Sequence, residues 1–290
     1  MIGFLNINKP SGMSSGAVVN KIKKIANIGR VGHMGTLDPM ACGVLPIALG
    51  KATRMFDYFL DKKKSYSAIF EFGYETDTLD KEGVVVDKTN KIPTLLEIQS
   101  VLHKMIGKIS QMPPKYSAKS VGGVRAYQLA RKGLEVDLKP KTVEIFNISV
   151  SQKSETMYAF DITCSSGTYI RSICRDIAYA VGSLATMIYL QRTNSGVFDI
   201  SDALDINTLT RDIIEQRLCR VEEVFSKFKT INVSNDNFVK LANGLVIGID
   251  MLDQKIFIKN NERLLGLADV INGQCKMIVN LYDDSMQSDK

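Results

Sequence analysis

The stretch Ser65-Tyr66-Ser67-Ala68-Ile69-Phe70-Glu71-Phe72 gives the clearest indication of the fold, because its side chains divide between two faces. Successive side chains of a β-strand point to opposite sides, so every second residue shares a face. Tyr66, Ala68, Phe70 and Phe72 then form one apolar and aromatic face, with Ser65, Ser67, Ile69 and Glu71 opposite. This pattern predicts a half-buried strand within a sheet.

Further strands and helices are expected on both sides of this strand. The predicted strands are 3–8, 44–49, 142–150, 157–164 and 185–192, and the predicted helices begin near Ser14 or Ser15, Thr53, Thr94 and Thr168. Thr94 and Glu97 form a capping-box pattern. Because strands and helices intermingle without a strict βαβ rhythm, we expect an α+β fold with a mixed, mainly antiparallel sheet and peripheral helices.

Composition is that of an ordinary globular protein, with 290 residues, 45% hydrophobic and 23% charged. His33 and His103 are the only histidines, which argues against zinc hydrolase sites and multi-histidine metal cages. The five cysteines are an odd number and contain no C-x-x-C motif, which indicates reduced thiols. Without a secretory leader or an apolar run of membrane-spanning length, we expect a cytoplasmic protein with no membrane partner.

The net charge of +6 is unevenly distributed along the chain. Residues 1–229 hold 31 basic and 23 acidic groups, a balance of +8, whereas residues 230–290 hold 6 and 8, a balance of −2. The same boundary separates mixed elements from short strand-like runs. We therefore predict one domain over 1–229 and a small, largely β domain over 230–290.

The segment 111–133 contains five cations and no acidic residue, interleaved with tyrosine, proline and glycine. The cations are Lys115, Lys119, Arg125, Arg131 and Lys132. Such a composition suits a loop that grips a phosphate backbone, and it suits a solvated surface loop equally well.

The segment Gly29-Arg30-Val31-Gly32-His33-Met34-Gly35-Thr36-Leu37-Asp38-Pro39 concentrates chemically useful residues in a predicted loop. Asp38 precedes a proline, which favours an extended backbone from which the carboxylate can project. The alternative is a turn aspartate that bonds to its own backbone. A P-loop, a serine nucleophile elbow and a magnesium-dependent phosphoryl aspartate all lack their required neighbours here. What remains is a lone carboxylate acting as nucleophile or base without metal or cofactor.

Residues 32–39 together with Gly43-Val44-Leu45-Pro46 and Gly50-Lys51-Ala52-Thr53 closely resemble the bacterial tRNA pseudouridine-55 synthases. The resemblance continues to about residue 198 in four further blocks. They are Lys64-Ser65-Tyr66, Tyr116-Ser117-Ala118, Ser166-Gly167-Thr168-Tyr169-Ile170-Arg171-Ser172 and Leu190-Gln191-Arg192-Thr193. It implies the pseudouridine synthase fold and isomerisation of uridine in the T-arm loop of tRNA. Met34 departs from the family pattern, where a small hydroxyl residue is expected.

The resemblance also implies roles for individual residues. Asp38 matches the catalytic nucleophile, Arg171 the arginine that pairs with it, and Tyr66 the tyrosine that stacks on uracil and helps remove the C5 proton. His33 matches the histidine beside the flipped nucleotide, and Tyr169 and Leu190 match further substrate contacts. Ordinary packing is the alternative for Tyr66, Tyr169 and Leu190, and a solvated surface position is the alternative for Arg171.

The expected partner is therefore the tRNA T-arm, bound by a monomer that needs no cofactor. The segment 111–133 falls where the family has a loop that closes over the T-arm, and the C-terminal domain is PUA-like in size and position. A non-catalytic tRNA-binding or folding factor and a synthase acting on another RNA are the alternatives. Attack at ribose C1′ and attack at pyrimidine C6 both remain open at this point.

Overall fold

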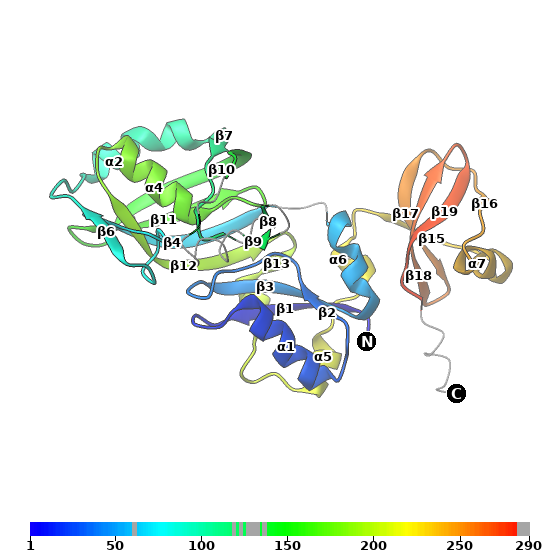
Figure 1. Cartoon of the computed structure of the whole chain (residues 1–290). Helices are drawn as coiled ribbons and strands as arrows, with labels where there is room; N and C mark the ends of the chain where they lie inside the picture. Colours follow the sequence, from blue (N-terminus) through cyan, green and yellow to red (C-terminus); the bar gives the residue numbers. More distant parts are fainter. Residues whose placement is uncertain (60–62, 118–119, 122–123, 126–133, 135–137, 283–290) are drawn as a thin grey trace.

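A computed structural model describes residues 1–59, 63–117, 120–121, 124–125, 134 and 138–282 (Figure 1). The strands of the main sheet and of the hairpin beside it are β1 (Gly3–Lys9), β2 (Val31–His33), β3 (Cys42–Leu49), β4 (Lys64–Phe72), β5 (Tyr74–Thr76), β6 (Val85–Lys88), β7 (Gly107–Gln111), β10 (Lys141–Gln152), β11 (Met157–Cys164), β12 (Ala185–Ser195), β13 (Phe198–Asp199) and β14 (Leu204–Asp205). Two short strands, β8 (Ser120–Val121) and β9 (Val124–Arg125), pair with each other.

The main sheet has the order β14-β1-β3-β12-β4-β11-β10-β7, with β2 paired to β3 and β13 paired to β12. Only the β1–β14 and β3–β12 pairs are parallel, so the sheet is mixed and mainly antiparallel. The alternation in β4 is confirmed, since Tyr66, Ala68, Phe70 and Phe72 are all buried. β4 lies between β12 and β11, near the middle of the sheet.

Helices pack around this sheet and complete its core (Figure 1). They are α1 (Ser15–Ala26), η1 (Gly50–Tyr58), α2 (Leu95–Leu102), η2 (His103–Met105), α4 (Ile170–Ala180), η3 (Ile200–Asp202), α5 (Arg211–Arg217) and α6 (Val221–Val224). Ser14 caps α1 by accepting a hydrogen bond from the Ala17 amide, and the capping box predicted at Thr94 is present. α4 packs on β12 and β4, which carries Arg171 to the sheet.

Two local predictions differ from the structure, and one helix lies in the C-terminal region that is largely β, as predicted. Residues 31–33 form a strand inside the predicted loop, because their backbone pairs with β3. The helix expected over 53–60 is a 3₁₀ helix that begins at Gly50. Helix α7 (Asn235–Ala242) interrupts the β-rich C-terminal region, where Ser234 caps it by accepting from the Asn237 amide.

The C-terminal region forms its own five-stranded sheet, separate from the main one. Its strands are β15 (Lys229–Asn232), β16 (Ile247–Gly248), β17 (Gln254–Asn260), β18 (Arg263–Ile271) and β19 (Gln274–Asn280). A hydrophobic cluster joins this sheet to the main sheet through Phe257, Leu267 and Val279 on one side and Phe4 and Met34 on the other. None of the helices in the described ranges is long and apolar enough to cross a membrane.

Candidate active site

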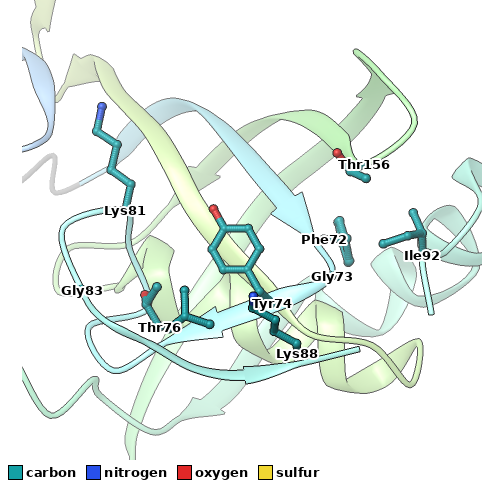
Figure 2. A pocket seen from close by; sticks show the side chains of 10 residues that line it. Phe72, Gly73, Tyr74, Thr76, Lys81, Gly83, Lys88, Ile92 and Thr156 are labelled. Carbon is teal, nitrogen blue, oxygen red and sulfur yellow. The ribbon is translucent and has the colours of Figure 1, made fainter. Parts of the chain in front are cut away.

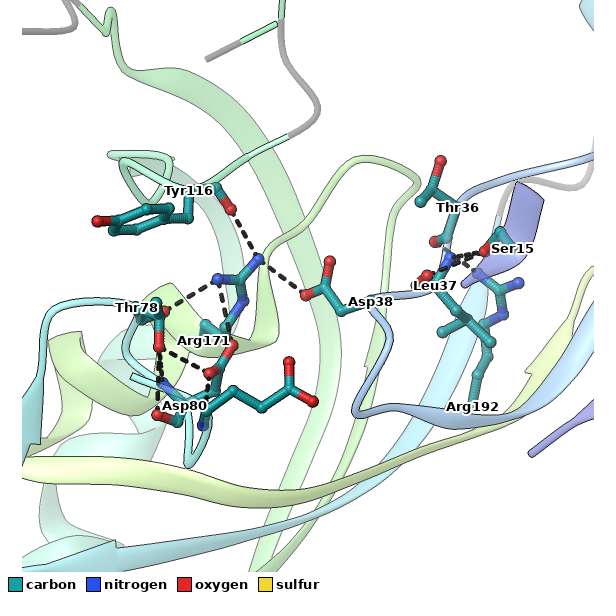
Figure 3. A network of polar contacts seen from close by, with 10 residues as sticks. Ser15, Thr36, Leu37, Asp38, Thr78, Asp80, Tyr116, Arg171 and Arg192 are labelled. Carbon is teal, nitrogen blue, oxygen red and sulfur yellow. Dashed lines mark hydrogen bonds and ion pairs between the residues drawn. The ribbon is translucent and has the colours of Figure 1, made fainter. Parts of the chain in front are cut away.

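The loop that carries Asp38 is fastened to the start of the chain by polar contacts. Ser15 Oγ donates to the Leu37 carbonyl and accepts from the Leu37 amide, both at 2.9 Å (Figure 3). Lys9 is buried, and its Nζ donates to the carbonyls of Pro10, Met13 and Pro39. Because these contacts lie on both sides of Asp38 along the chain, the loop is held rigidly where it presents the carboxylate.

Arg192 supports the same loop from the sheet. Its side chain is completely buried and donates to the carbonyls of Val44 at 2.7 Å and Gly35 at 3.1 Å. Gly35 has φ +117° and Gly43 has φ +99°, conformations that favour glycine. A side chain at position 43 would collide with the Arg192 carbonyl, since β3 and β12 approach closely there.

Asp38, Arg171 and Asp80 form a continuous charged network (Figure 3). Arg171 Nη2 lies 2.8 Å from Asp38 Oδ2, and Arg171 Nη1 lies 3.4 Å from Asp80 Oδ2. The guanidinium also donates to the carbonyls of Thr78 at 2.9 Å and Tyr116 at 3.0 Å. The Arg171 side chain is 6% exposed and that of Asp38 is 37% exposed, so the arginine is fixed from behind while the carboxylate faces outward. Arg171 is therefore not the solvated surface residue of the alternative interpretation.

Asp80 is held by the turn on which it lies. Its Oδ1 accepts hydrogen bonds from Thr78 Oγ1 at 2.7 Å and from the Glu82 amide at 3.1 Å. Leu79 has φ +62°, an uncommon conformation for a residue with a side chain, and hydrogen bonds between this turn and Met187 hold it. Such strain is characteristic of functional sites.

A cavity of about 660 Å³ opens in front of this network. Asp38, Arg171, His33, Tyr116 and Ser117 are among its lining residues. Its size is within the range of small-ligand sites. The Asp38 carboxylate is thus presented to a space large enough for a nucleoside.

His33 and Tyr66 are both neutral at pH 7 in this environment. Burial, followed by the charges of Arg192 and Lys64, lowers the pKa of His33, and its Nδ1 is buried with no hydrogen-bond partner in the described part of the chain. Burial raises the pKa of Tyr66 to about 12, against the opposing effect of Arg192. The imidazole is therefore uncharged, and the phenol keeps its proton.

The other predicted site residues are placed less directly. Tyr169 caps the start of α4, where its backbone exchanges two hydrogen bonds with the Gln111 side chain. Leu190 is 6% exposed and packs in the main core. Tyr66, Tyr169 and Leu190 do not line the 660 Å³ cavity, so their substrate contacts stay predictions.

Only part of the predicted RNA-gripping segment can be placed. Lys115 is exposed beside Tyr116. Lys119, Arg131 and Lys132 lie outside the described residues, and only the backbone of Arg125 is described, in β9. Met34, which replaces the expected hydroxyl residue, is 6% exposed and packs in the cluster that joins the two sheets.

Sequence reasoning assigned no role to Asp80 or Arg192. A charged residue within the strand-like run 185–192 could have indicated that Arg192 is buried with a specific role. Asp80 had none, because it lies 42 positions from Asp38 and 91 from Arg171 along the chain.

A second cavity of about 610 Å³ lies along β5 and β6, beside Tyr74 (Figure 2). The charged side chains in its described lining are Lys81 and Lys88, so it offers no carboxylate for chemistry of the kind available at Asp38. No cluster of three or more potential metal-binding side chains is found among the residues that the structure describes.

Comparison with known proteins gives two family matches. Residues 23–170 match the model for the TruB family pseudouridylate synthase N-terminal domain, and residues 171–225 match that for the tRNA pseudouridylate synthase B C-terminal domain. The chain is 38% identical to a tRNA pseudouridine synthase B of Clostridium perfringens, over 90% of this chain and 88% of that one. It is 39% identical to the enzyme of that name from Clostridium kluyveri, over 96% and 99%.

Solved structures with a similar fold include a chain of a Cbf5–Nop10–Gar1 complex. That match has a TM-score of 0.68 at 25% identity, covering 93% of this chain and 78% of the other. A chain of an H/ACA ribonucleoprotein bound to a substrate RNA matches with a TM-score of 0.66 at 23% identity, covering 93% and 78%. The α+β fold with a mixed sheet predicted from the sequence agrees with these matches.

Proposed function

The chain belongs to the TruB family of pseudouridylate synthases, and from that premise we propose that it isomerises uridine to pseudouridine in the T-arm loop of tRNA. Asp38 is the nucleophile, Arg171 positions it, and Tyr66 holds the base. The observation that carries this assignment is the 2.8 Å ion pair between a buried Arg171 and an outward-facing Asp38 at the cavity.

The reaction exchanges one bond to the ribose for another. The N1–C1′ bond breaks, the uracil turns, C5 bonds to C1′, the proton on C5 leaves and N1 takes up a proton, so the product is an isomer and nothing is hydrolysed or reduced. Asp38 acts by attack of its carboxylate oxygen on C1′ or C6, which requires the ionised form. The Arg171 guanidinium, 2.8 Å from Asp38 Oδ2, fixes the direction of attack.

The target base must leave its stack before Asp38 can reach it, at a cost of a few kcal/mol. His33 offsets part of this cost by filling the vacated space as a neutral ring, which the lowered pKa supports. Tyr66 stacks on the extruded uracil as a neutral phenol when the edge of the core opens into the cavity, which Tyr66 does not line in this structure. With a pKa of about 12, only about one Tyr66 in 10⁵ is ionised at pH 7, so it removes the C5 proton only if it first loses its own proton.

In this proposal the two domains have different functions. Residues 1–229 form the catalytic domain, with the segment 111–133 closing over the T-arm, and residues 230–290 form a PUA-like appendage. The contacts of Lys115, Lys119, Arg125, Arg131 and Lys132 are with the RNA backbone. The protein acts as a cytoplasmic monomer, and its reaction uses no cofactor.

A tritium-release assay tests the function. The substrate is a T-arm hairpin labelled at C5 of its uridines, and the matched control has cytidine at the target position. We expect one equivalent of tritium from the first hairpin and none from the second. A folded protein that releases none from either, or equal amounts from both, is not this enzyme.

A further inference from the structure

A group of cations lies beside the Asp38 loop, and no acidic side chain among the described residues forms an ion pair with any of them. Lys64 is the first residue of β4 and shares the sheet face of Tyr66, because the two are separated by two positions. Arg192 of β12 is paired with Tyr66 of the neighbouring strand β4, so the Arg192 side chain extends from the same face of the sheet. Lys141 begins β10, and its Nζ lies against Gly167, in the turn before Tyr169.

Lys64 reaches the Asp38 loop itself. A Cβ at position 35 would lie 2.8 Å from Lys64 Nζ and 3.7 Å from an Arg192 guanidinium nitrogen. The lysine head group therefore lies against Gly35, three residues before Asp38. The absence of a side chain at Gly35 is what gives it room.

The charged and titratable groups around Lys64 do not neutralise it. Among the described residues, Arg192 on β12 and Lys141 on β10 repel its positive charge, while Cys164 on β11, whose pKa burial raises to about 11, is a neutral thiol at pH 7. The charge of Lys64 in turn acts on His33 of β2. Burial first, and then Arg192, lower the pKa of Lys64 to about 8.

Lys9 shows what a structural lysine looks like in this protein. Burial lowers its pKa to about 8 as well, yet its Nζ donates to three main-chain carbonyls. Lys64 Nζ has no hydrogen bond or ion pair with any described residue. Lys64 is only partly buried, so its ammonium group keeps contact with solvent, and an anionic acceptor from outside the chain can reach it beside Gly35.

We propose that Lys64, assisted by Lys141 and by the field of Arg192, binds one phosphodiester of the substrate RNA next to the target nucleotide. This inference rests on the proposed function. A phosphodiester supplies the missing negative charge and its acceptor oxygens. Bound against Gly35, it fixes the register of the RNA backbone beside Asp38, so that the extruded base enters the cavity.

The test measures binding of a T-arm hairpin by the full chain carrying Asp38→Asn, which prevents turnover. Lys64→Met and Lys141→Gln are added separately to this background. Lys153→Gln is the matched control, because Lys153 is exposed just beyond the far end of β10 from Lys141, roughly 40 Å away at about 3.3 Å per residue. Hairpins with a single neutral methylphosphonate at each position near the target identify the phosphate.

We expect Lys64→Met to weaken binding about tenfold and to lower the slope of log Kd against log salt by about 0.7–0.9, the contribution of one phosphate. Lys141→Gln should show a smaller change in the same direction, and Lys153→Gln none. One methylphosphonate should weaken binding by the Asp38→Asn protein about tenfold and have no further effect with Lys64→Met. The Lys64→Met protein should melt no lower than its parent, because the partly buried Lys64 charge is repelled by Arg192 and forms no ion pair with a described residue.

Unchanged affinity and salt slope in both Lys64→Met and Lys141→Gln would overturn the proposal. The proposal would also be overturned if the affinity lost with Lys64→Met added to the affinity lost with each methylphosphonate, because no single phosphate would then be bound by Lys64. If Lys64→Met fails to fold, Lys141→Gln and the methylphosphonate series still decide. Failure of the proposed function would be seen separately, as absence of tritium release by the unmodified protein.

Discussion

Arg171 and Arg192 are two buried arginines on either side of the Asp38 loop, and only the charge of Arg171 is compensated by carboxylates of the described residues. Arg171 contacts two carboxylates and two carbonyls, so its charge is fully compensated. Among the described residues, Arg192 donates to the carbonyls of Val44, Thr36 and Gly35 and lies beside the Tyr66 hydroxyl, and its charged neighbours include Lys64, another cation.

The difference assigns the two regions different tasks. On the Arg171 side, the positive charge is matched within the protein, and the site positions a reactive carboxylate. On the Arg192 side, the positive charge is left over and is available to an anionic substrate. A single loop, 35–38, joins the two regions, which couples the position of the RNA backbone to the position of the nucleophile.

Removing the compensated charge should have the larger effect. Arg171→Met leaves Asp80 buried without its cation and Asp38 without its positioning partner. We expect a loss of about 10²–10³ in the single-turnover rate of tritium release and about 3–5 kcal/mol in the free energy of unfolding.

The double variant Arg171→Met/Asp80→Asn separates these two effects. It removes the orphaned buried charge, so stability measured by urea denaturation should largely recover while the rate stays low. Recovery of the rate along with stability would mean that Arg171 acts only in folding.

Changing the geometry of Arg192 should have an intermediate effect. Arg192→Lys keeps the charge but loses the planar fork that donates to Gly35 and Val44. We expect a cost of about 1–3 kcal/mol in stability from unsatisfied buried carbonyls and a rate about tenfold lower.

Arg211→Lys is the control for this substitution. Arg211 pairs with Glu215 on the exposed surface of α5, so its replacement should cost less than about 0.5 kcal/mol. Equal costs for the two variants would show that Arg192 does not support the loop.

The uncompensated charge should also be visible as a dependence of stability on pH. The pKa of Lys64 is about 8 in the folded protein and about 10.5 in the unfolded chain, so the unfolded state holds more protons between these values. Stability of the RNA-free protein should therefore gain, from this group, on the order of 1–3 kcal/mol as the pH rises from about 8 to 10. Lys9 also has a pKa of about 8 in the folded protein, so it contributes to the gain in stability over the same pH range. The pH profile of the unmodified protein is therefore compared with that of Lys64→Met, which should lack the part of the gain due to Lys64. Identical pH profiles for the two proteins would contradict an uncompensated Lys64.

Local patterns predicted most of this arrangement. The alternation at Tyr66–Phe72 identified a central strand, and the capping box at Thr94 identified a helix, because both depend on neighbouring residues. The Asp38–Arg171 contact followed only from a family resemblance, since nothing local tells a surface arginine from one buried against the sheet.

Long-range contacts could not be predicted in this way. Asp80 reaches Arg171 through a strained turn at Leu79, and Arg192 meets Gly35 through pairing of β3 with β12. The unpaired state of Lys64 is visible only once β4, β10, β11 and β12 have been assembled. Such facts are properties of the tertiary structure.

The most direct test of Asp38 as nucleophile is single-turnover tritium release by Asp38→Asn. The substitution keeps the size of the side chain and removes the reactive carboxylate. We predict release below about 10⁻⁴ of the unmodified rate, with T-arm hairpin affinity unchanged within about threefold. Release at more than a few per cent of the unmodified rate would contradict the account.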